Sequence, residues 1–269
     1  MIESNKIPVI QLNKIFRQAA KSKIIVNAHH VNNGEGFISK NSQEVKETEE
    51  DFFYINELSQ EKMLYQVLSL CKDRLKKYGN YEFYKDMQVL TPTKKGMLGT
   101  KELNKALQDT LNPKGEQKEE KTYGDQIFRQ GDRVMQIKND YDIFWEKKNS
   151  LENGTGIFNG EIGTIVQIDQ ESKQIKIEFD DNKISWYAYT SLDELELAYS
   201  ITIHKSQGSE FNVVILVIPP SSPMLLTRNL LYTAITRAKK LLIVIGSNKI
   251  IEFMVKNADS KTRNTRPKI

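Results

Sequence analysis

The pattern of apolar and polar residues predicts alternating strands and helices toward both ends of the chain. Continuous apolar runs are typical of buried strands, and they occur at Lys23–Ala28, Asp86–Thr91, Val213–Ile218 and Leu241–Gly246. Apolar residues at helical spacing predict helices over Leu58–Tyr78, Thr100–Leu111 and Met224–Ala238. Buried strands that alternate with helices indicate an α/β fold, in which helices cover both faces of a parallel sheet.

The pattern changes in the middle of the chain. Asn112–Thr122 is polar and charged, which predicts an exposed linker. Between Asp132 and Tyr189, Gly, Asn and Asp turns separate four short alternating segments, RVMQIK, GTIVQI, QIKIEF and KISWYAY. These segments predict a small β-barrel inserted into the α/β domain. We expect residues 128–192 to form the barrel, and residues 1–127 and 193–269 to form the discontinuous α/β domain.

Composition and charge exclude several classes of protein. The 269 residues carry a formal net charge of +4, so binding to nucleic acid would depend on where the positive side chains lie. A single cysteine, Cys71, allows no internal disulfide and no zinc cluster, and its place in a helical apolar face predicts a core residue. The sequence has no apolar run long enough for a signal peptide or a membrane span. We therefore expect a cytoplasmic protein without a metal site or a membrane partner.

Two segments concentrate polar chemistry beside predicted strands. Ile201–Phe211 (ITIHKSQGSEF) places hydroxyl, imidazole, ammonium and amide groups next to Gly208. Short donors and a backbone that permits close approach are what phosphate groups require. The second segment, Leu231–Lys240, contains Arg237, which the pattern alone assigns to the surface of an amphipathic helix. An arginine there needs further evidence before it is given a function.

These segments resemble motifs of a known family, and they occur in the family's order. Thr202–Phe211 resembles motif V of superfamily 1 helicases, Leu230–Lys240 resembles motif VI, and Leu12–Gln18 (LNKIFRQ) resembles motif IV. Val89–Pro113 and Gly131–Gly163 resemble segments of RecD-type members. The ordered set implies the C-terminal part of a RecD-like DNA helicase, with a RecA-like second motor domain and an SH3-like barrel. It also implies a role in DNA repair and recombination, as in the α subunit of exodeoxyribonuclease V.

The resemblance implies residues for ATP. Such motors hold ATP between two RecA-like domains, and an arginine from the facing domain commonly meets the charge that develops on the transferred phosphoryl group. Arg17 and Arg237 match the two arginines that the family directs at the γ-phosphate. Gln18, Gln207 and Gly208 match positions beside the phosphates, and Glu210 matches an acidic residue near the ribose.

The resemblance also implies residues for single-stranded DNA. The expected DNA-binding residues are Thr91, Thr93, Lys94, Asn159, Thr202, His204 and Lys205. His204 has an alternative interpretation of equal weight as a structural cap. The aromatic residues Trp145, Trp186 and Tyr187 could stack on bases, but core packing is the better interpretation for at least one of Trp186 and Tyr187, because strand neighbours face opposite sides.

Two elements of a complete motor are missing from the sequence. It contains no G-x-x-x-x-G-K-[ST] phosphate loop, and no apolar strand ends in an Asp-Glu pair that could hold magnesium. We therefore expect a chain that begins just after the first RecA-like domain and is inactive alone. ATP and Mg²⁺ would be bound mainly by that first domain, which is the expected partner together with single-stranded DNA, a duplex junction and recombination or repair proteins.

Two other functions fit part of the pattern. A stand-alone nucleic-acid-binding module would have no use for phosphate-sensing arginines such as Arg17 and Arg237. The helicase region of a conjugative relaxase, or an RNA helicase of superfamily 1, would share motifs V and VI. The RecD-like segments at residues 89–113 and 131–163 favour the DNA helicase, for which the resemblance implies 5′ to 3′ movement.

Overall fold

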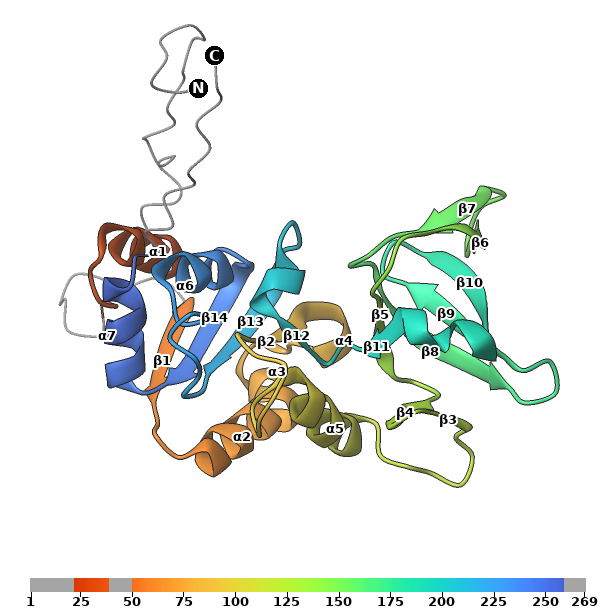
Figure 1. Cartoon of the computed structure of the whole chain (residues 1–269), viewed down its shortest axis with the longest axis horizontal. Helices are drawn as coiled ribbons and strands as arrows, with labels where there is room; N and C mark the ends of the chain where they lie inside the picture. The colour runs from red at the N-terminus through yellow and green to blue at the C-terminus, as the bar shows by residue number, and fades with distance from the viewer. Residues whose placement is uncertain (1–21, 39–49, 259–269) are drawn as a thin grey trace, which may run out of the picture.

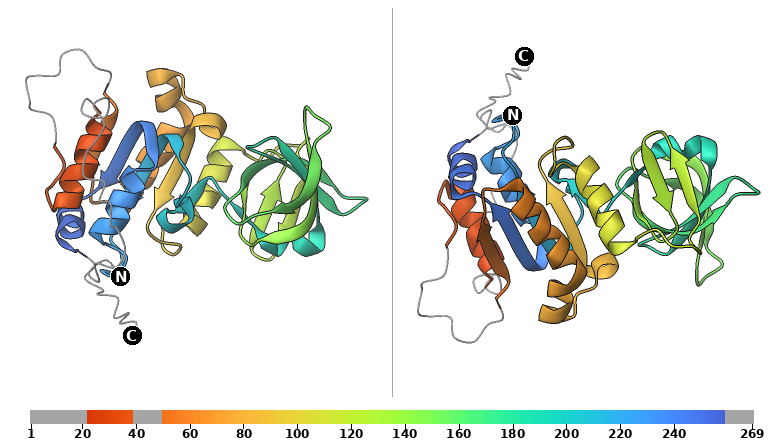
Figure 2. Two further views of the ribbon diagram at one scale, coloured as in Figure 1. Left: turned by 90° about the horizontal axis from the view of Figure 1, so that it is seen from above. Right: turned by 90° about the horizontal axis from the view of Figure 1, so that it is seen from below.

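The computed structural model describes residues 22–38 and 50–258. Arg17, Gln18 and the rest of the motif IV segment lie outside these residues. The described chain forms two lobes, an α/β lobe and a β-rich lobe, which lie side by side (Figures 1 and 2).

The α/β lobe contains a five-stranded sheet in which all neighbouring strands are parallel. Its strand order is β1-β14-β13-β2-β12. The strands are β1 (Phe52–Asn56), β2 (Met87–Thr91), β12 (Ser200–Thr202), β13 (Phe211–Ile218) and β14 (Ala238–Gly246). The central strands are almost entirely apolar and buried, as expected for a sheet covered on both faces.

Helices cover both faces of this sheet. One face packs against α1 (Lys23–Asn33), α6 (Arg228–Ile235) and α7 (Asn248–Lys256). The other packs against α2 (Gln60–Ser69), α3 (Leu75–Gly79), α4 (Phe83–Asp86) and α5 (Thr100–Leu111), with a π-helical turn, η3 (Leu70–Arg74), between α2 and α3. The α/β class predicted from sequence is therefore confirmed, and the fold is that of a RecA-like domain. Cys71 is buried as predicted, and burial raises the pKa of its thiol.

One predicted strand is wrong. Residues 23–28 belong to helix α1, which begins after Ser22 and ends before Gly34. The Ser22 side chain accepts a hydrogen bond from the main-chain nitrogen of Ile25, and Gly34 adopts a φ of 86° that favours glycine. Ile24, Ala28 and Val31 are buried at helical spacing. A short apolar run does not distinguish a strand from a buried helix, and the two capping residues were the missed signal.

The helix predicted at residues 224–238 is shorter, because α6 begins at Arg228 and ends at Ile235. Its amino end is fixed by Thr227, whose side chain accepts a hydrogen bond from the main-chain nitrogen of Leu230. Ala238 begins strand β14 instead.

The β-rich lobe is an antiparallel seven-stranded sheet with the order β11-β5-β8-β9-β10-β6-β7. Its strands are β5 (Arg133–Gln136), β6 (Asp140–Lys147), β7 (Asn153–Ile157), β8 (Ile162–Asp169), β9 (Gln174–Phe179), β10 (Lys183–Ala188) and β11 (Leu195–Leu197). A 3₁₀ turn, η4 (Tyr189–Glu194), joins β10 to β11. The four predicted strands are confirmed, with an SH3-like architecture. Tyr187 is a core residue, whereas Trp186 is 39% exposed and lies under the Lys176 ammonium.

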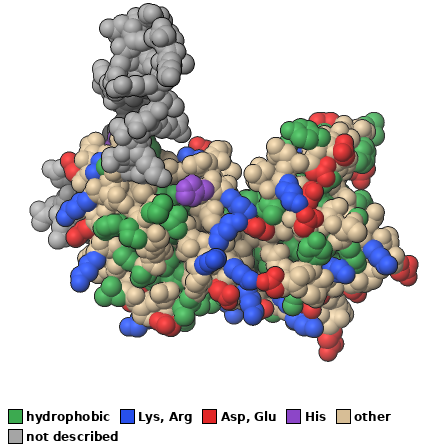
Figure 3. Space-filling view, viewed as in Figure 1, with side chains coloured by type: hydrophobic (Ala, Val, Ile, Leu, Met, Phe, Trp, Pro, Cys, Tyr) green, Lys and Arg blue, Asp and Glu red, His purple; other side chains and the backbone are tan. Residues whose placement is uncertain are grey.

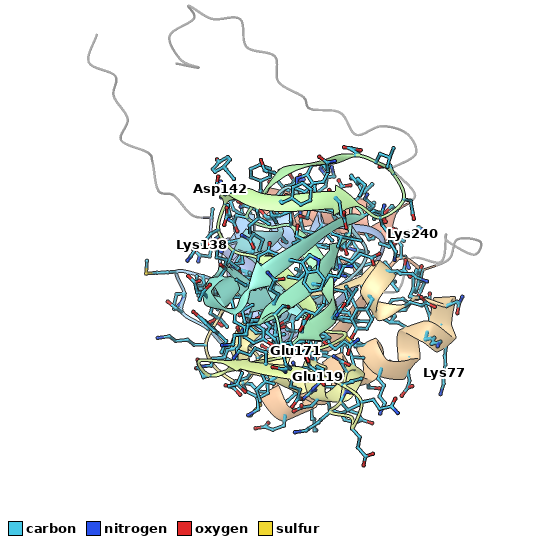
Figure 4. The ribbon with its side chains drawn as sticks, turned by 90° about the vertical axis from the view of Figure 1, so that its right-hand side faces the viewer. Lys77, Glu119, Lys138, Asp142, Glu171 and Lys240 are labelled. Carbon is cyan, nitrogen blue, oxygen red and sulfur yellow. The ribbon has the colours of Figure 1, made fainter. Side chains whose placement is uncertain are left out.

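A hairpin of β3 (Glu120–Tyr123) and β4 (Gln126–Arg129) precedes the barrel. The expected exposed linker therefore ends in a strand. The Gln170 amide donates hydrogen bonds to the Glu119 carboxylate and to the main-chain oxygen of Glu120, which ties the hairpin to the β8–β9 turn. Figure 4 views this side of the barrel and shows the exposed acids Glu119 and Glu171 near one another.

A buried carboxylate joins the two lobes. Asp132 is completely buried, and it accepts hydrogen bonds from Gln108 and Asn112 at the end of α5 and from the Tyr199 hydroxyl just before β12. Burial raises the pKa of Asp132, while its hydrogen bonds act in the opposite direction. Because Asp132 begins the barrel and these three donors belong to the α/β lobe, this cluster fixes the start of the barrel relative to α5 and β12. No helix among residues 22–38 and 50–258 is long and apolar enough to cross a membrane.

Candidate functional site

Two loops carry most of the expected DNA-binding residues, and they begin at the same edge of the sheet. β2 and β12 are parallel neighbours, and Thr91 is the register partner of Thr202. Each threonine is the last residue of its strand. The loops that follow therefore leave the sheet side by side, at the carboxyl ends of the strands, where α/β sheets commonly bind ligands.

The loop after β2 is held in shape by Thr91. This side chain is completely buried, and its hydroxyl donates a hydrogen bond to the main-chain oxygen of Leu98 at 2.8 Å. A Cβ at Gly99 would lie 2.5 Å from the main-chain oxygen of Lys95, so the loop closes tightly on itself. Thr91 thus shapes the loop, and its hydroxyl does not face solvent as a direct phosphate contact requires. Lys94 is exposed, and Thr93 is half-buried.

The loop after β12 is a 3₁₀ turn, η5 (Ile203–Ser206). The Thr202 side chain caps it by accepting a hydrogen bond from the main-chain nitrogen of Lys205. The cap is thus formed by Thr202, while the His204 side chain is exposed. The buried Ser206 hydroxyl donates to the main-chain oxygen of Ile203, which tightens the turn. The structure therefore presents His204 at the surface beside the half-buried Lys205.

Glu196, a residue not singled out from the sequence, lies between the two loops. Its carboxylate is 2.6 Å from the Lys205 ammonium and 3.6 Å from that of Lys94. A small pocket between the lobes is lined by Lys94, Thr202 and Lys205 of the α/β lobe and by Met135 of the barrel. It shares Lys94, Thr100 and Glu196 with a larger pocket beside it, and the two together are called the basic groove below. Figure 3 shows Lys and Arg side chains gathered along this boundary. The site is therefore basic, with one carboxylate that partly neutralises it.

Asn159 belongs to the other lobe. It lies in the turn between β7 and β8, where its main-chain nitrogen donates to the Asn139 side chain and its own side chain is exposed. The next residue, Gly160, donates from its main-chain nitrogen to the oxygen of Gln136, which follows Met135 in β5. Strand β5 therefore lies between Asn159 and the groove. The other expected DNA-binding residues belong to the two loops or to the strand ends that precede them.

Arg237 follows α6 and contacts the segment that leaves η5. Its guanidinium donates to the main-chain oxygen of Ser209 at 2.9 Å, to that of Thr233 at 3.1 Å and to the Thr236 hydroxyl at 3.2 Å. These three contacts use three of its five N–H donors and leave one on each terminal nitrogen. The Arg237 side chain is therefore held in one position, and one N–H on each terminal nitrogen remains able to donate to another group.

The described residues expected near ATP, Gln207, Gly208 and Glu210, lie next to Ser209 in the chain and so beside this contact. Gln207 is exposed, and Gly208 has a φ of 87° with no atom near the position of a Cβ, so a phosphate could approach its backbone closely. Glu210 is exposed and lies 3.1 Å from the Lys239 ammonium. Gln207, Gly208 and Glu210 are therefore all open to solvent at this surface. Within the described ranges, no group of three His, Cys, Asp or Glu residues is arranged to hold a metal ion.

The segment from Thr202 to Phe211 runs from the carboxyl ends of the parallel strands to their amino ends. Thr202 is level with Thr91 at the carboxyl end of β2, whereas Phe211 pairs with Ala238 at the amino end of β14. His204 and Lys205 therefore lie near the carboxyl ends of the strands. Ser209 and its partner Arg237 lie toward the amino ends. One short segment links the basic groove to the arginine.

Two family models match adjacent parts of the chain. The model described as the SH3 domain of ATP-dependent RecD-like DNA helicases matches residues 103–179. The model described as the UvrD-like helicase C-terminal domain matches residues 197–245. The second match contains β12, η5, β13, α6 and most of β14, and therefore both Arg237 and its partner Ser209.

Curated proteins resemble this chain over a larger span. The ATP-dependent RecD2 DNA helicase of Deinococcus radiodurans is 32% identical over 240 residues, which cover 89% of this chain and 29% of that protein. The RecBCD enzyme subunit RecD of Buchnera aphidicola subsp. Schizaphis graminum is 32% identical over 177 residues, which cover 65% of this chain and 27% of that protein. The chain thus spans under a third of the length of these relatives.

Solved structures show a weaker likeness. The crystal structure of Pif1 helicase from Bacteroides in complex with ADP-AlF3 and ssDNA has a TM-score of 0.48 and 19% identity. The match covers 91% of this chain and 53% of that one. The sequence matches, and not this likeness, relate the chain to known proteins.

Proposed function

Because this chain is homologous to the C-terminal region of RecD-like superfamily 1 helicases, we propose that it is the C-terminal motor half of an ATP-dependent DNA helicase. Residues 1–127 and 193–269 would act as the second RecA-like domain, and residues 128–192 as the SH3-like barrel. The first RecA-like domain, which would bind most of the ATP and Mg²⁺, is the proposed partner. Movement is proposed to be 5′ to 3′ along single-stranded DNA, within DNA repair or recombination.

The course of residues 202–211 is the observation that carries this proposal. A motor must couple events at a nucleotide to its grip on DNA. Here Ser209, which Arg237 holds, and Lys205, which lines the basic groove, belong to one short segment. A shift of the Arg237 guanidinium toward a phosphate would alter its contact with Ser209, and that change would reach η5 within a few residues. A binding module without motor activity would not need this link.

The nucleotide end of the segment offers positive charge and open backbone. When bound, ATP supplies a γ-phosphoryl group whose transfer to water releases free energy. Arg237, together with Arg17 from outside the described residues, would meet the charge on that group, because a planar guanidinium can grip two oxygens at once. Gln207, Gly208 and Gln18 would lie beside the phosphates, and Glu210 near the ribose.

The DNA end offers phosphate contacts without base readout. Lys94, Lys205 and His204 would attract and position the phosphates, with Thr93 and Thr202 as shorter-range partners. Thr91 would act by keeping the loop after β2 in its observed shape. Asn159 would contact the strand from the barrel side of the groove. Such contacts hold any sequence equally well, as a translocating enzyme requires.

The experiment that tests the proposal separates DNA binding from ATP hydrolysis. The chain alone should bind an oligothymidylate with an affinity that Lys205→Ala lowers, yet it should not hydrolyse ATP with or without DNA. The protein that also contains the first motor domain should show DNA-stimulated hydrolysis, and Arg237→Ala should abolish it. DNA-stimulated turnover by a clean preparation of the chain alone would overturn the assignment as half of a motor.

A further inference from the structure

Two aromatic rings lie exposed at the rim of the barrel. Tyr141, near the start of β6, is 66% exposed, and Phe158, in the turn after β7, is 41% exposed. Their ring centroids are 5.6 Å apart with an interplanar angle of 74°. Large apolar surface left in water often marks a binding site, and this pair adds no ring to the barrel core.

The turn that carries Phe158 is firmly held. The main-chain nitrogen of Phe158 donates to the Glu161 carboxylate at 3.0 Å, and a second oxygen of that carboxylate pairs with the Lys183 ammonium at 2.9 Å. The Phe158 ring lies over Gly156, where a Cβ would be 3.1 Å from the ring. Gly156 also has a φ of 101°, which disfavours other residues. The ring is therefore presented in a fixed position, which lowers the entropy cost of binding.

This rim is linked to the basic groove through strand β5. Gly160, in the same turn, donates to the main-chain oxygen of Gln136, and its neighbour Met135 lines the groove with Thr202 and Lys205. Ile162, at the end of the turn, packs in one apolar cluster with Met135 and Ile203 of η5. Figure 3 shows the surface hollowed between the two lobes. The rim therefore lies one β-strand away from the groove proposed to hold the DNA.

We propose that Tyr141 and Phe158 form a base-stacking site on the barrel for the single strand whose phosphates lie in the groove. The proposal rests on the DNA-binding function proposed above and adds a contact to the bases. Every base has a π-face, so an aromatic ring binds a strand without selecting its sequence. The lysines of the groove hold phosphates, and the ring pair holds a base against the opposite lobe. The strand is thereby gripped from both sides.

The alternative is that the two rings only cover Gly156 and support the β6–β7 hairpin. The double variant Tyr141→Leu/Phe158→Leu separates the two roles, because leucine keeps an apolar cover and removes both π-faces. Its control is Tyr65→Leu, which removes a ring that is 69% exposed on α2. Affinity is measured by fluorescence anisotropy on the intact protein, with an oligothymidylate and with an abasic oligonucleotide of equal length.

We expect the double variant to bind oligothymidylate about tenfold more weakly and to bind the abasic strand as the wild type does. The Tyr65→Leu variant should match the wild type on both strands. An unchanged affinity for oligothymidylate, or an equal loss on both strands, would overturn the stacking site. In the wild type, the fluorescence of 2-aminopurine should change on binding when the probe stands at one position of the oligonucleotide. An unchanged fluorescence at every position would also overturn the site.

Lys205→Ala distinguishes this inference from the function on which it rests. It should weaken binding to the intact and the abasic strand alike, because both carry phosphates. If neither strand binds the wild type, the proposed function and the stacking site fail together. If both strands bind through Lys205 and the aromatic variant binds normally, only the stacking site fails.

Discussion

Arg237 donates a hydrogen bond to the main-chain oxygen of Ser209 at 2.9 Å, although the two residues are 28 positions apart in the chain. The contact joins the end of α6 to the segment that leaves η5. Phe211 donates from its main-chain nitrogen to the oxygen of Arg237, which adds a second link at the same point. The geometry of the arginine and the geometry of the loop are therefore not independent.

The first prediction concerns Arg237. In the intact helicase, Arg237→Ala should lower kcat for ATP hydrolysis by about a thousandfold, the scale known for arginines that contact a transferred phosphoryl group. The dissociation constant for ATP, measured separately, should change much less. Arg237→Lys should also lose most activity, because an ammonium keeps the charge without the planar fork. Arg17→Ala should behave like Arg237→Ala. Near-normal kcat in both alanine variants would remove these residues from the nucleotide site.

The second prediction concerns Glu196, which pairs with Lys205 and Lys94. Glu196→Gln should release both lysines and raise the affinity for single-stranded DNA several-fold at low salt, because an opposing charge is removed from the groove. Lys205→Ala should reduce the slope of log affinity against log salt by roughly one counterion or less. The matched control is Glu171→Gln, an exposed acid on the outer side of the barrel (Figure 4). Equal effects of Glu196→Gln and the control would show that only net charge matters.

The third prediction separates two residues that the sequence grouped together. His204→Ala should weaken DNA binding without a change in thermal stability, because its side chain is exposed. Thr91→Val should weaken binding and also lower stability, by about 1–3 kcal/mol, because it leaves the oxygen of Leu98 without its buried donor. Thr91→Ser should restore both properties. If Thr91→Val keeps full stability but loses DNA affinity, its hydroxyl contacts the strand directly after all.

The motif residues illustrate what sequence could and could not predict. The periodicities predicted the parallel sheet, the barrel strands and the buried Cys71, because burial imposes a repeat that sequence displays directly. The run at residues 23–28 was misassigned, because apolar residues fit a buried helix and a buried strand equally and only the caps decide. The burial of Thr91 depends on a hydrogen bond to Leu98 across a loop, which no local pattern encodes.

The roles of Glu196 and Asp132 also escaped prediction. Both acids acquire their partners from distant elements. The Asp132 donors include Gln108 of α5 and Tyr199 near β12, so the cluster exists only after the two lobes are assembled. The aromatic pair Tyr141–Phe158 joins β6 to the turn after β7, a pairing that sequence does not reveal. Such pairings follow from the tertiary arrangement of the strands, which no local sequence pattern encodes.

The fourth prediction concerns pH. The Arg129 guanidinium, only 2.6 Å away and nearly buried, lowers the pKa of Glu120 below its usual value of 4.5, and Lys114 acts in the same direction. A carboxyl whose pKa is lower in the folded state stabilises the fold above its unfolded pKa, and that stabilisation is lost as pH falls through the folded pKa. Glu120→Gln should therefore lower the free energy of unfolding by about 1.5 kcal/mol at pH 7. The difference from the wild type should vanish below the lowered pKa of Glu120. A difference that is constant with pH would mean that packing, not charge, links the β3–β4 hairpin to Arg129.

The last prediction concerns the barrel, which we expect to guide the strand and not to contact ATP. The structure indicates where to remove it, because the main-chain nitrogen of Ile137 donates to the oxygen of Glu194 at 2.8 Å. Residues 138–193 can therefore be replaced by an Asn-Gly turn that closes β5 onto β11. Asp132 and its partners Gln108, Asn112 and Tyr199 lie outside the excised segment, so the junction with α5 should survive.

We expect the intact helicase with this excision to fold, to retain part of its DNA-stimulated ATPase and to lose duplex unwinding in a strand-displacement assay. Motor chemistry requires only the two RecA-like domains, whereas unwinding requires that the strand be held while the duplex opens. The control replaces residues 148–151 with the same turn, because the main-chain nitrogen of Lys147 donates to the oxygen of Glu152. That smaller change shortens the β6–β7 tip, leaves Tyr141 and Phe158 in place, and should unwind normally. If the large excision folds and unwinds at the wild-type rate, the barrel takes no part in the track and serves only to stabilise the sheet beside it.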